Sequence, residues 1–393
     1  MRPPPALVSV WLLAVAVCAD SGQRAHTRAP SNCRDHAGRP GVCGTVHDCP
    51  PLLALVSNGR RPSAEEVSQL RRSQCRVPGG SRRRVLLCCA LPPPPPPPAA
   101  PEEPFDGEPE EHPNRRLLER GEPCGSSLVP RITGGKEVRH GQHPWMALIG
   151  YRHAETGRVS YRCGGALIGR RHVLTAAHCL VSLPAQLRLD SVRLGDHNLS
   201  RPTDCARAPD GRPVCGVPQE FRIAALFIHS DYNKPSARLN DIALLKLDRP
   251  VVEDNFVGKI CLPFDSARHR NYTGVGLSAV GFGSVGPGRD SPSSEVLLEV
   301  VLPGVDQQRC AAAVRRLGGL LGPRQMCAGG EPGRDVCFGD SGAPLVADPG
   351  PGELAPTLVG LVAYGARLCD GAVPGVFTRV SSYLNWILDR IDD

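Results

Sequence analysis

The sequence predicts an all-β protein, and three of its features lead to that prediction. Short runs of aliphatic and β-branched residues alternate with turn signals between Ile132 and Asp393. The 43 glycines and 41 prolines among 393 residues place much of the chain in turns and loops, which excludes long helical bundles. The 17 cysteines are many for a cytosolic protein of this size and indicate a disulfide-bonded fold.

The clearest strands are four short apolar runs, and the end of the chain has a different pattern. Strands so short and so regularly punctuated favour a β-barrel or a β-sandwich. From Ser381 to Asp393, apolar residues recur at helical spacing, so we expect a C-terminal helix there. The four runs are Trp145–Ile149, Val173–Thr175, Ile242–Leu247 and Leu358–Val362.

Residues 1–19 are expected to be a secretory signal. An apolar stretch of 12 residues, from Ala6 to Val17, precedes small residues suited to cleavage after Ala19. The alternative, a membrane anchor, would need about 20 apolar residues. Cleavage also removes Cys18 and leaves 16 cysteines, an even number. We therefore expect a secreted, extracellular protein without a membrane span.

Residues 33–89 are expected to form a small domain held by disulfides. The segment has six cysteines and too little apolar periodicity to build a core alone. Fifteen pairings are possible, and the spacing does not choose among them. Zinc is the alternative, but the spacings are wide and His47 stands alone. Basic residues in this segment are either a solvated face or a docking surface for an acidic partner. They are Arg71, Arg72, Arg76 and Arg82 to Arg84.

Residues 90–131 are expected to be a linker. The seven prolines from Pro92 to Pro98 predict a stiff polyproline spacer. The segment Glu102–Glu111 is acidic and interrupted by prolines, so we expect it to be disordered, exposed and open to proteolysis.

The overall composition excludes some classes of protein without selecting a partner. With 41% hydrophobic and 22% charged residues, the chain is neither wholly disordered nor a polytopic membrane protein. A net charge of +7 is too small an excess to indicate nucleic-acid binding.

Residues 132–393 contain three points at which chemistry is expected. His178 follows the run Val173–Thr175, and a histidine can take a proton from a hydroxyl and return it to a leaving group. Asp241 heads the run Ile242–Leu247, where burial would partly desolvate its carboxylate. Taken singly, the histidine is more often structural and the aspartate more often part of a turn.

The third point is the segment from Cys337 to Leu345. Glycines on both sides of Ser341 let the backbone fold tightly around it. The N–H groups of Gly339 and Ser341 can then converge on one point and hold the oxyanion formed when Ser341 attacks a carbonyl carbon.

Together, in the order His, Asp, Ser, these points resemble the chymotrypsin-like serine proteases over all of residues 132–393. The resemblance implies two six-stranded antiparallel barrels with the active site at their junction. It also implies that Ser341 is the nucleophile, that His178 is the general base and then acid, and that Asp241 orients the imidazole.

The sequence Arg131-Ile132-Thr133-Gly134-Gly135 resembles the activation site of this family. Cleavage after Arg131 creates an amine on Ile132 that can be buried only if it pairs with a carboxylate, which in the family is Asp340. The intact chain should therefore be a zymogen. Other basic bonds, after Arg115, Arg116 and Arg120, lack such a following sequence.

The resemblance also implies the substrate preference. Asp335 matches the base of the primary pocket in trypsin-like members, and a carboxylate there favours arginine, then lysine. Gly365 and Gly375 match the small pocket walls. Four residues depart from the family pattern. They are Ala343 for a glycine, Ala363 for a serine beside the triad, and Tyr364 and Phe282 for tryptophans.

The cysteines pair completely under the family pattern. The large-domain pair Cys205–Cys215, together with the six-cysteine segment, is similar to the pattern of clip-domain proteases of arthropods, especially the easter and prophenoloxidase-activating group. One pair would keep the clip domain attached to the catalytic chain after cleavage, namely Cys124 with Cys261. The others would be Cys33–Cys88, Cys43–Cys75, Cys49–Cys89, Cys163–Cys179, Cys205–Cys215, Cys310–Cys327 and Cys337–Cys369.

In this group the loop before the pair Cys205–Cys215 can hold calcium. Oxygen ligands at Asp196, Asn198 and Asp204 would suit that ion, although a solvated acidic loop is an equal alternative. No cofactor is expected to be required for catalysis. Asn198 and Asn271 begin glycosylation sequons, and a glycan on Asn198 would compete with the metal.

Two functions follow from these observations. The first is an active zymogen that cleaves another extracellular proprotein in an immune, melanisation or developmental cascade. Its partners would be an upstream activating protease, a downstream proprotein or zymogen, and serpin inhibitors. The second is a silent homologue that acts as a binding cofactor through its clip domain. The presence of Ser341, His178 and Asp241 favours the enzyme.

Overall fold

The computed structural model divides the chain into two compact units, Met1–Glu102 and Glu103–Asp393, each described here by itself. The expected signal, the polyproline run and the bond between Arg131 and Ile132 lie outside the described residues. Within the part that the structure describes, no helix is long and apolar enough to cross a membrane. The described residues are 33–35, 38, 40–44, 52, 63–75, 86–90, 106–127, 136–181, 183–207, 211–284, 286, 291–316, 318–332, 335–365, 371 and 373–392.

The first unit is a small antiparallel sheet with one helix. Helix α2 (Ala64–Arg72) begins with a capping box between Ser63 and Glu66, which satisfies two backbone N–H groups. The described apolar cluster here contains only Leu52 and Leu87 with Leu70 and Cys89 against it, so disulfides must supply the remaining stability. The strands lie in the order β1 (Cys33–Arg34), β2 (Pro40–Gly44), β4 (Leu86–Ala90) and β3 (Gln74–Cys75).

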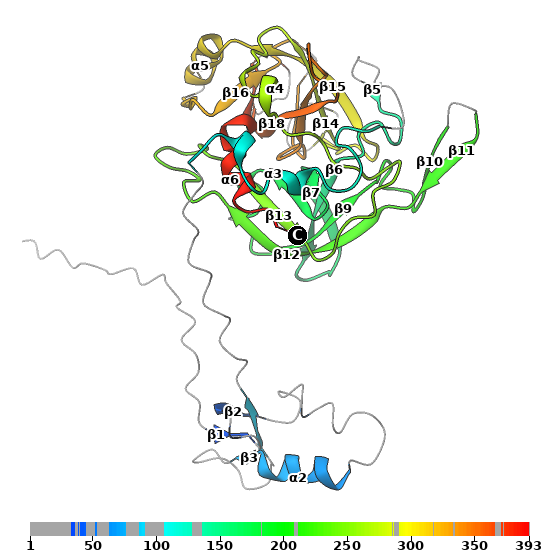
Figure 1. Ribbon diagram of the computed structural model, residues 1–393, viewed down its shortest axis with the longest axis vertical. Helices are drawn as coiled ribbons and strands as arrows, with labels where there is room; N and C mark the ends of the chain where they lie inside the picture. Colours follow the sequence, from blue (N-terminus) through cyan, green and yellow to red (C-terminus); the bar gives the residue numbers. More distant parts are fainter. Residues whose placement is uncertain are drawn as a thin grey trace, which may run out of the picture. The chain divides into compact units, whose positions relative to one another are not determined.

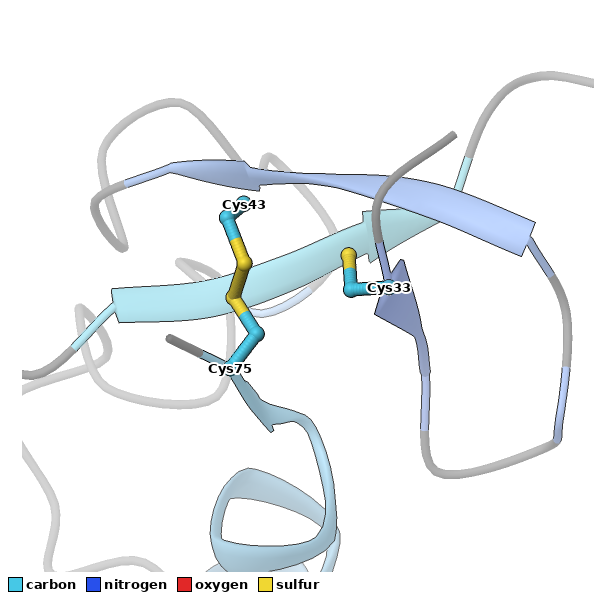
Figure 2. A group of neighbouring side chains, drawn as sticks. All are labelled: Cys33, Cys43 and Cys75. Carbon is cyan, nitrogen blue, oxygen red and sulfur yellow. A yellow bond between two sulfur atoms is a disulfide. The ribbon is translucent and has the colours of Figure 1, made fainter. Parts of the chain in front are cut away.

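Disulfides join the strands of this unit. Figure 2 shows the bond between Cys43 and Cys75, with Cys33 beside it. These three sulfur atoms lie within 4.8 Å of one another, as zinc ligands would. Cys33 is bonded to Cys88, however, and sulfurs engaged in disulfides offer no thiolate to a metal. Cys89 is also disulfide-bonded, and its expected partner Cys49 lies outside the described residues.

The second unit contains two barrels, of which the first is a closed six-stranded one (Figure 1). Large side chains fill its interior, including Trp145, Tyr151 and Phe221, each at most 2% exposed. Three of the four predicted strand runs become β6, β8 and β13. In order around the barrel the strands are β12 (Gln219–Ile228), β13 (Ala243–Leu247), β8 (His172–Thr175), β7 (Val159–Gly169), β6 (Met146–His153) and β9 (Leu187–Leu194).

The second barrel closes because β14 pairs with both β17 and β15. Strand β5 (Lys136–Glu137) adds to the edge of β15, outside the six-stranded ring. The fourth predicted strand run becomes β18, and the expected pair of six-stranded barrels is confirmed. In order the strands are β14 (Gly276–Gly281), β17 (Pro344–Ala347), β18 (Thr357–Tyr364), β19 (Gly375–Arg379), β16 (Gln325–Ala328) and β15 (Leu298–Val305).

The C-terminal helix is confirmed but is shorter than predicted. A 3₁₀ turn, η4 (Val380–Tyr383), leads into α6 (Leu384–Leu388). Leu384, Ile387 and Leu388 are buried in the core cluster of the first barrel, which explains the helical spacing read from the sequence. Two other helices, α4 (Asp265–His269) and α5 (Gln307–Arg316), had not been predicted. Figure 1 also shows a projecting hairpin, β10 (Asp204–Arg207) with β11 (Pro213–Gly216).

The acidic linker segment differs most from its prediction. Residues 106–127 belong to the second unit, so the expectation of a disordered segment at Glu102–Glu111 is wrong for its described part, although Asp106, Glu108 and Glu111 are exposed as expected. Arg268 forms ion pairs with both Glu108 and Glu110. Asn385 Nδ2 donates to the carbonyl of Gly107 at 2.8 Å, and Pro109 is buried. The acidic residues therefore find a cation that lies 158 residues away in the sequence.

The same segment continues as helix α3 (Arg115–Leu118), which is also anchored. Arg115 Nη2 lies 2.8 Å from Asp265 Oδ2, and its guanidinium packs over the ring of Phe264. Asn114 Nδ2 donates to the carbonyl oxygen of Leu388 at 2.9 Å. The bond after Arg115 is therefore engaged in tertiary structure and is not freely available to a protease.

Arg268→Gln should loosen this docked segment, because Glu108 and Glu110 then lose their shared cation. The rate of tryptic cleavage after Arg115 should rise about two- to fivefold, as expected for partly exposed ion pairs. Limited proteolysis followed by mass spectrometry measures that rate. Arg309→Gln, at an exposed arginine of α5, is the matched control and should leave it unchanged. An unchanged rate in the Arg268 variant would show that these ion pairs do not hold the segment.

Candidate active site

His178 and Asp241 are brought together by two neighbouring strands. His178 lies in the 3₁₀ turn Ala177–Cys179 after β8, and Asp241 lies two residues before β13. Because β8 and β13 pair with Ala243 opposite Thr175, their ends meet at one place. The Asp241 carboxylate accepts from the backbone N–H of His178 at 2.9 Å, and Oδ2 lies 2.7 Å from Nδ1. This bidentate contact fixes both the position and the tautomer of the imidazole.

Asp241 itself is held by residues that the sequence did not reveal. Its side chain is only 3% exposed, and its carbonyl oxygen accepts from Thr378 Oγ1 at 2.8 Å. The neighbouring Asn240 accepts a hydrogen bond from Tyr383 Oη at 2.9 Å. Both donors lie about 140 residues further along the chain. No local pattern could have indicated them, since the contacts exist only after the barrels assemble.

The Ser341 loop comes from the second barrel and meets the first at the histidine. The carbonyl of Ser341 accepts from Gly164 N–H at 2.8 Å, and Cys179 Sγ lies 3.6 Å from the same oxygen. Gly342 has φ +74°, and a Cβ there would lie 2.3 Å from Thr175 Oγ1. Glycine is therefore required at 342 for both conformation and space. The structure thus brings the three expected triad residues to the junction of the barrels.

Asp340, next to Ser341, has an enclosed carboxyl group. Oδ1 accepts from Gly283 N–H at 2.8 Å and Oδ2 from Cys337 N–H at 2.9 Å. A Cβ on Gly281 or Gly283 would lie about 2 Å from these oxygens, so glycine walls surround them. Desolvation by burial raises the pKa of Asp340 to about 6, although the two amide donors oppose this shift. Among the described residues, no cation pairs with this carboxylate.

The loop that should form the oxyanion hole packs against the same wall. Gly339 has φ +100°, a conformation that other residues rarely adopt, and a Cβ there would lie 3.1 Å from Gly283 Cα. The N–H of Asp340 donates to the carbonyl oxygen of Cys337 at 3.1 Å, which closes a tight turn. The orientation of the Gly339 N–H therefore depends on how Asp340 is held.

The expected primary pocket has Asp335 at one end. Its Oδ1 accepts from Val336 N–H at 2.8 Å, and its Oδ2 lies 3.4 Å from the N–H of Gly371. A Cβ on Gly375 would approach Val336 and Phe377 at 3.3 Å, so a larger residue would crowd the wall. Gly365 is exposed and faces open space. These positions suit a narrow pocket with an acidic end.

Two of the departures from the family pattern are accommodated by the structure. Ala343 is fully buried and is absent from the described non-glycine residues with positive φ, so its methyl group causes no backbone strain. A Cβ on Gly164 would lie 2.8 Å from the Ala343 methyl, so the alanine makes glycine necessary at 164. Ala363 is buried and has no hydroxyl to offer Asp241.

The disulfides of this unit follow the expected pattern wherever both cysteines are described. The bond between Cys163 and Cys179 borders His178, and that between Cys124 and Cys261 joins the docked segment to the barrels. Cys205–Cys215 and Cys310–Cys327 are also formed. Cys337 is disulfide-bonded, and its expected partner Cys369 lies outside the described residues.

The loop proposed for calcium is stabilised by internal contacts. Asp196 forms an ion pair with Arg193 at 2.7 Å, and Asp204 Oδ2 accepts from the N–H groups of His197 and Asn198. Asn198 Oδ1 accepts from both the N–H and the hydroxyl of Ser200. These contacts engage all three side chains within the loop, and the calcium site stays a prediction from the resemblance.

The two glycosylation sequons differ in exposure. Asn271 is exposed, and its Oδ1 accepts from Thr273 N–H at 2.9 Å. Asn198 is only partly exposed and is held by Ser200. The surface at Asn271 therefore leaves more room for a glycan.

Comparisons with known proteins agree with this geometry. The trypsin family model matches residues 132–387, and the model for the regulatory CLIP domain of proteinases matches residues 33–89. CLIP domain-containing serine protease B10 of Anopheles gambiae is 36% identical over 93% of this chain and 95% of its own. Melanization protease 1 of Drosophila melanogaster is 36% identical over 72% of this chain and 71% of its own. The crystal structure of the Drosophila Grass clip serine protease of the Toll pathway covers 91% of this chain and 96% of its own, with 29% identity and a TM-score of 0.60.

The raised pKa of Asp340 gives the intact chain a specific pH dependence. Folded Asp340 binds its proton more tightly than the unfolded residue, so it stabilises the fold below about pH 4 and loses this effect as the pH rises through about 6. Asp340→Asn lacks this titration. Between pH 4 and pH 7, the wild type should lose about 2 to 3 kcal/mol of unfolding free energy relative to the variant. Denaturant unfolding measures both, and a constant difference across this range would contradict the assignment.

Proposed function

Since the chain belongs to the trypsin family of serine proteases and carries a regulatory CLIP domain, we propose that it is a secreted zymogen. It is activated by cleavage after Arg131 and then cleaves protein substrates after arginine, and less readily after lysine. As a serine endopeptidase it uses Ser341, His178 and Asp241.

The enclosed carboxylate of Asp340 is the observation that carries this proposal. In the intact chain it is held by two backbone N–H groups in a pocket that raises its pKa. A desolvated carboxylate of this kind has a strong affinity for a cation of the right geometry. The amine that cleavage creates on Ile132 supplies such a cation. Pairing with it would draw Asp340 away from Gly283 and reorient the Gly339 turn.

The geometry supports acyl transfer through a covalent intermediate. His178 Nε2 accepts the proton of Ser341 Oγ as that oxygen bonds to the carbonyl carbon of the substrate. The negative charge on the carbonyl oxygen is stabilised by the N–H groups of Gly339 and Ser341. When the tetrahedral intermediate collapses, the C–N bond breaks and His178 returns the proton to the leaving amine. Water then attacks the acyl-enzyme by the same route and releases the carboxylic acid and Ser341.

The names of the relatives support a role for this activity in a proteolytic cascade. Relatives include a melanization protease, and a solved clip protease acts in the Toll pathway. We infer that this chain has an upstream protease that cuts at Arg131 and a downstream proprotein substrate in melanisation or a developmental or immune pathway. Serpins, which trap activated serine proteases through an arginyl bond, would be its inhibitors. The disulfide between Cys124 and Cys261 would keep the CLIP domain attached after activation.

Ile132→Gly tests the activation switch. Removing the isoleucine side chain should lose the apolar burial that helps insert the new terminus, worth about 1.5 to 3 kcal/mol. The cleaved variant should therefore have about ten- to a hundredfold lower kcat/KM on an arginyl peptide. N-terminal sequencing confirms that cleavage at Arg131 still occurs. Thr133→Ala is the matched control, and full activity in cleaved Ile132→Gly would refute the switch.

Asp335→Ser tests the primary pocket. Without the carboxylate, the guanidinium of the substrate enters the pocket unpaired, so kcat/KM for arginyl peptides should fall about a hundredfold or more. Ser341 should still react with a small uncharged acylating inhibitor, which separates lost specificity from misfolding. Arginyl cleavage at the wild-type rate would overturn the role of Asp335.

The alternative, a silent homologue that binds through its CLIP domain, makes a different prediction for the same protein. After cleavage at Arg131, a silent chain would not consume a covalent serine inhibitor. The proposed protease should consume one equivalent per chain and lose all peptidase activity in parallel. The close contact between His178 and Asp241 favours the active form.

A further inference from the structure

An arginine with no acidic partner lies beside the active site. The guanidinium carbon of Arg238 is 4.7 Å from the centre of the Tyr364 ring, a cation–π contact. Arg238 is exposed, and among the described residues no carboxylate lies within ion-pair distance of it. Arginines elsewhere on this unit, including Arg152 and Arg268, have such partners. The charge of Arg238 is therefore available to a ligand.

The backbone at Arg238 is held by contacts on both sides. Arg238 has φ +66°, in the left-handed region that few residues other than glycine adopt. Its N–H donates to Asn233 Oδ1 at 2.7 Å, and its carbonyl accepts from Gln325 Nε2 at 2.9 Å. A strained conformation fixed by contacts on both sides is typical of a functional position. These contacts fix the backbone of Arg238, and the Tyr364 ring contacts its guanidinium, so less conformational entropy is lost when the side chain binds a ligand.

The pair formed by Arg238 and Tyr364 lies where a substrate must pass. Arg238 is three residues before Asp241 in the sequence, and Tyr364 directly precedes Gly365, the expected wall of the primary pocket. Strand β18 leads to this point from the nucleophile, because Gly342 N–H donates to the carbonyl of Val362 at 2.8 Å. A substrate arginine that enters beside Gly365 therefore carries its neighbouring residues past Tyr364.

The two sides of the scissile bond can be told apart. His178 Nε2 protonates the leaving amine, and Cys179 Sγ lies 3.9 Å from that nitrogen. The leaving segment accordingly extends over the disulfide of Cys179 with Cys163. The acyl segment, which carries the arginine and the residues before it, extends along β18 toward Tyr364.

We propose that Arg238 and Tyr364 form a subsite that selects an acidic side chain among the three residues directly before the cleaved arginine, on its N-terminal side. This inference rests on the proposed function and adds to it a second charge that the enzyme recognises. A carboxylate in the substrate would pair with the guanidinium, while the Tyr364 ring contacts the aliphatic part of the same side chain. A lysine there would meet a like charge and be disfavoured.

Short fluorogenic peptides with a C-terminal arginyl amide test the proposal on the full chain cleaved at Arg131. Each of the second to fourth positions before the bond carries glutamate, glutamine or lysine in turn. At one or more of these positions, kcat/KM for glutamate should exceed that for glutamine about two- to fivefold, the size of an exposed ion pair. The kcat/KM for the lysine peptides should fall below that for the glutamine peptides. The preference should shrink at high ionic strength, because salt screens exposed charges.

Arg238→Gln should remove this preference by lowering kcat/KM for the glutamate peptides toward that for the glutamine peptides, and Arg238→Glu should reverse it toward lysine. Arg249→Gln is the matched control, because Arg249 also stacks on an aromatic ring, that of Phe221 in β12, and is exposed. It should keep the wild-type preference. Equal rates for glutamate and lysine in the wild type, or an unchanged preference in Arg238→Gln, would overturn the subsite alone. If no arginyl peptide is cleaved, the proposed function falls and this inference falls with it.

Discussion

The carboxyl group of Asp340 is the constraint on which the active site depends. It is enclosed by Gly281 and Gly283, and among the described residues its hydrogen-bond donors are backbone N–H groups, so its charge is held at a cost that raises its pKa. Because it neighbours Ser341, any movement of this carboxylate also moves the backbone N–H groups beside the nucleophile. The chain thus keeps an unfavourable buried charge next to Ser341, the proposed nucleophile. Such a group can act as a switch, because pairing with one new cation would offset the desolvation cost of its charge.

The barrels supply the remaining geometry through long-range hydrogen bonds. His178 and Asp241 come from the first barrel, and Ser341 comes from the second. Backbone contacts across the junction, such as that from Gly164 to Ser341, set their relative position. The C-terminal segment adds a brace, because Tyr383 holds Asn240 next to Asp241. Residues 106–127 in turn pack on the C-terminal helix through Asn114 and Asn385, so the linker segment belongs to the catalytic unit.

Sequence reasoning succeeded where chemistry is local. The short apolar strand runs between turn signals and the Ser341 loop with its glycines could be predicted, because each is a short pattern, whereas the cysteine pairing came from the family resemblance. It failed where a partner lies far away in the chain. An acidic, proline-containing segment has the composition of a disordered one until Arg268 provides a cation for Glu108 and Glu110. Arg238 and Tyr364 likewise have no shared pattern, because only the fold brings them within 4.7 Å.

Two charges of opposite sign would then determine which bonds are cut. Under the proposed function, Asp335 would accept the basic side chain of the cleaved residue, and Arg238 would favour an acidic side chain before it. Free energies of independent contacts add, so their selectivities multiply. The pocket at Asp335 would give the larger factor in selectivity, because an unpaired buried charge is costly. The exposed Arg238 would give a smaller factor that depends on salt. Sites that combine both charges would be preferred over the many arginyl bonds of extracellular proteins, although each contact alone is common to many substrates.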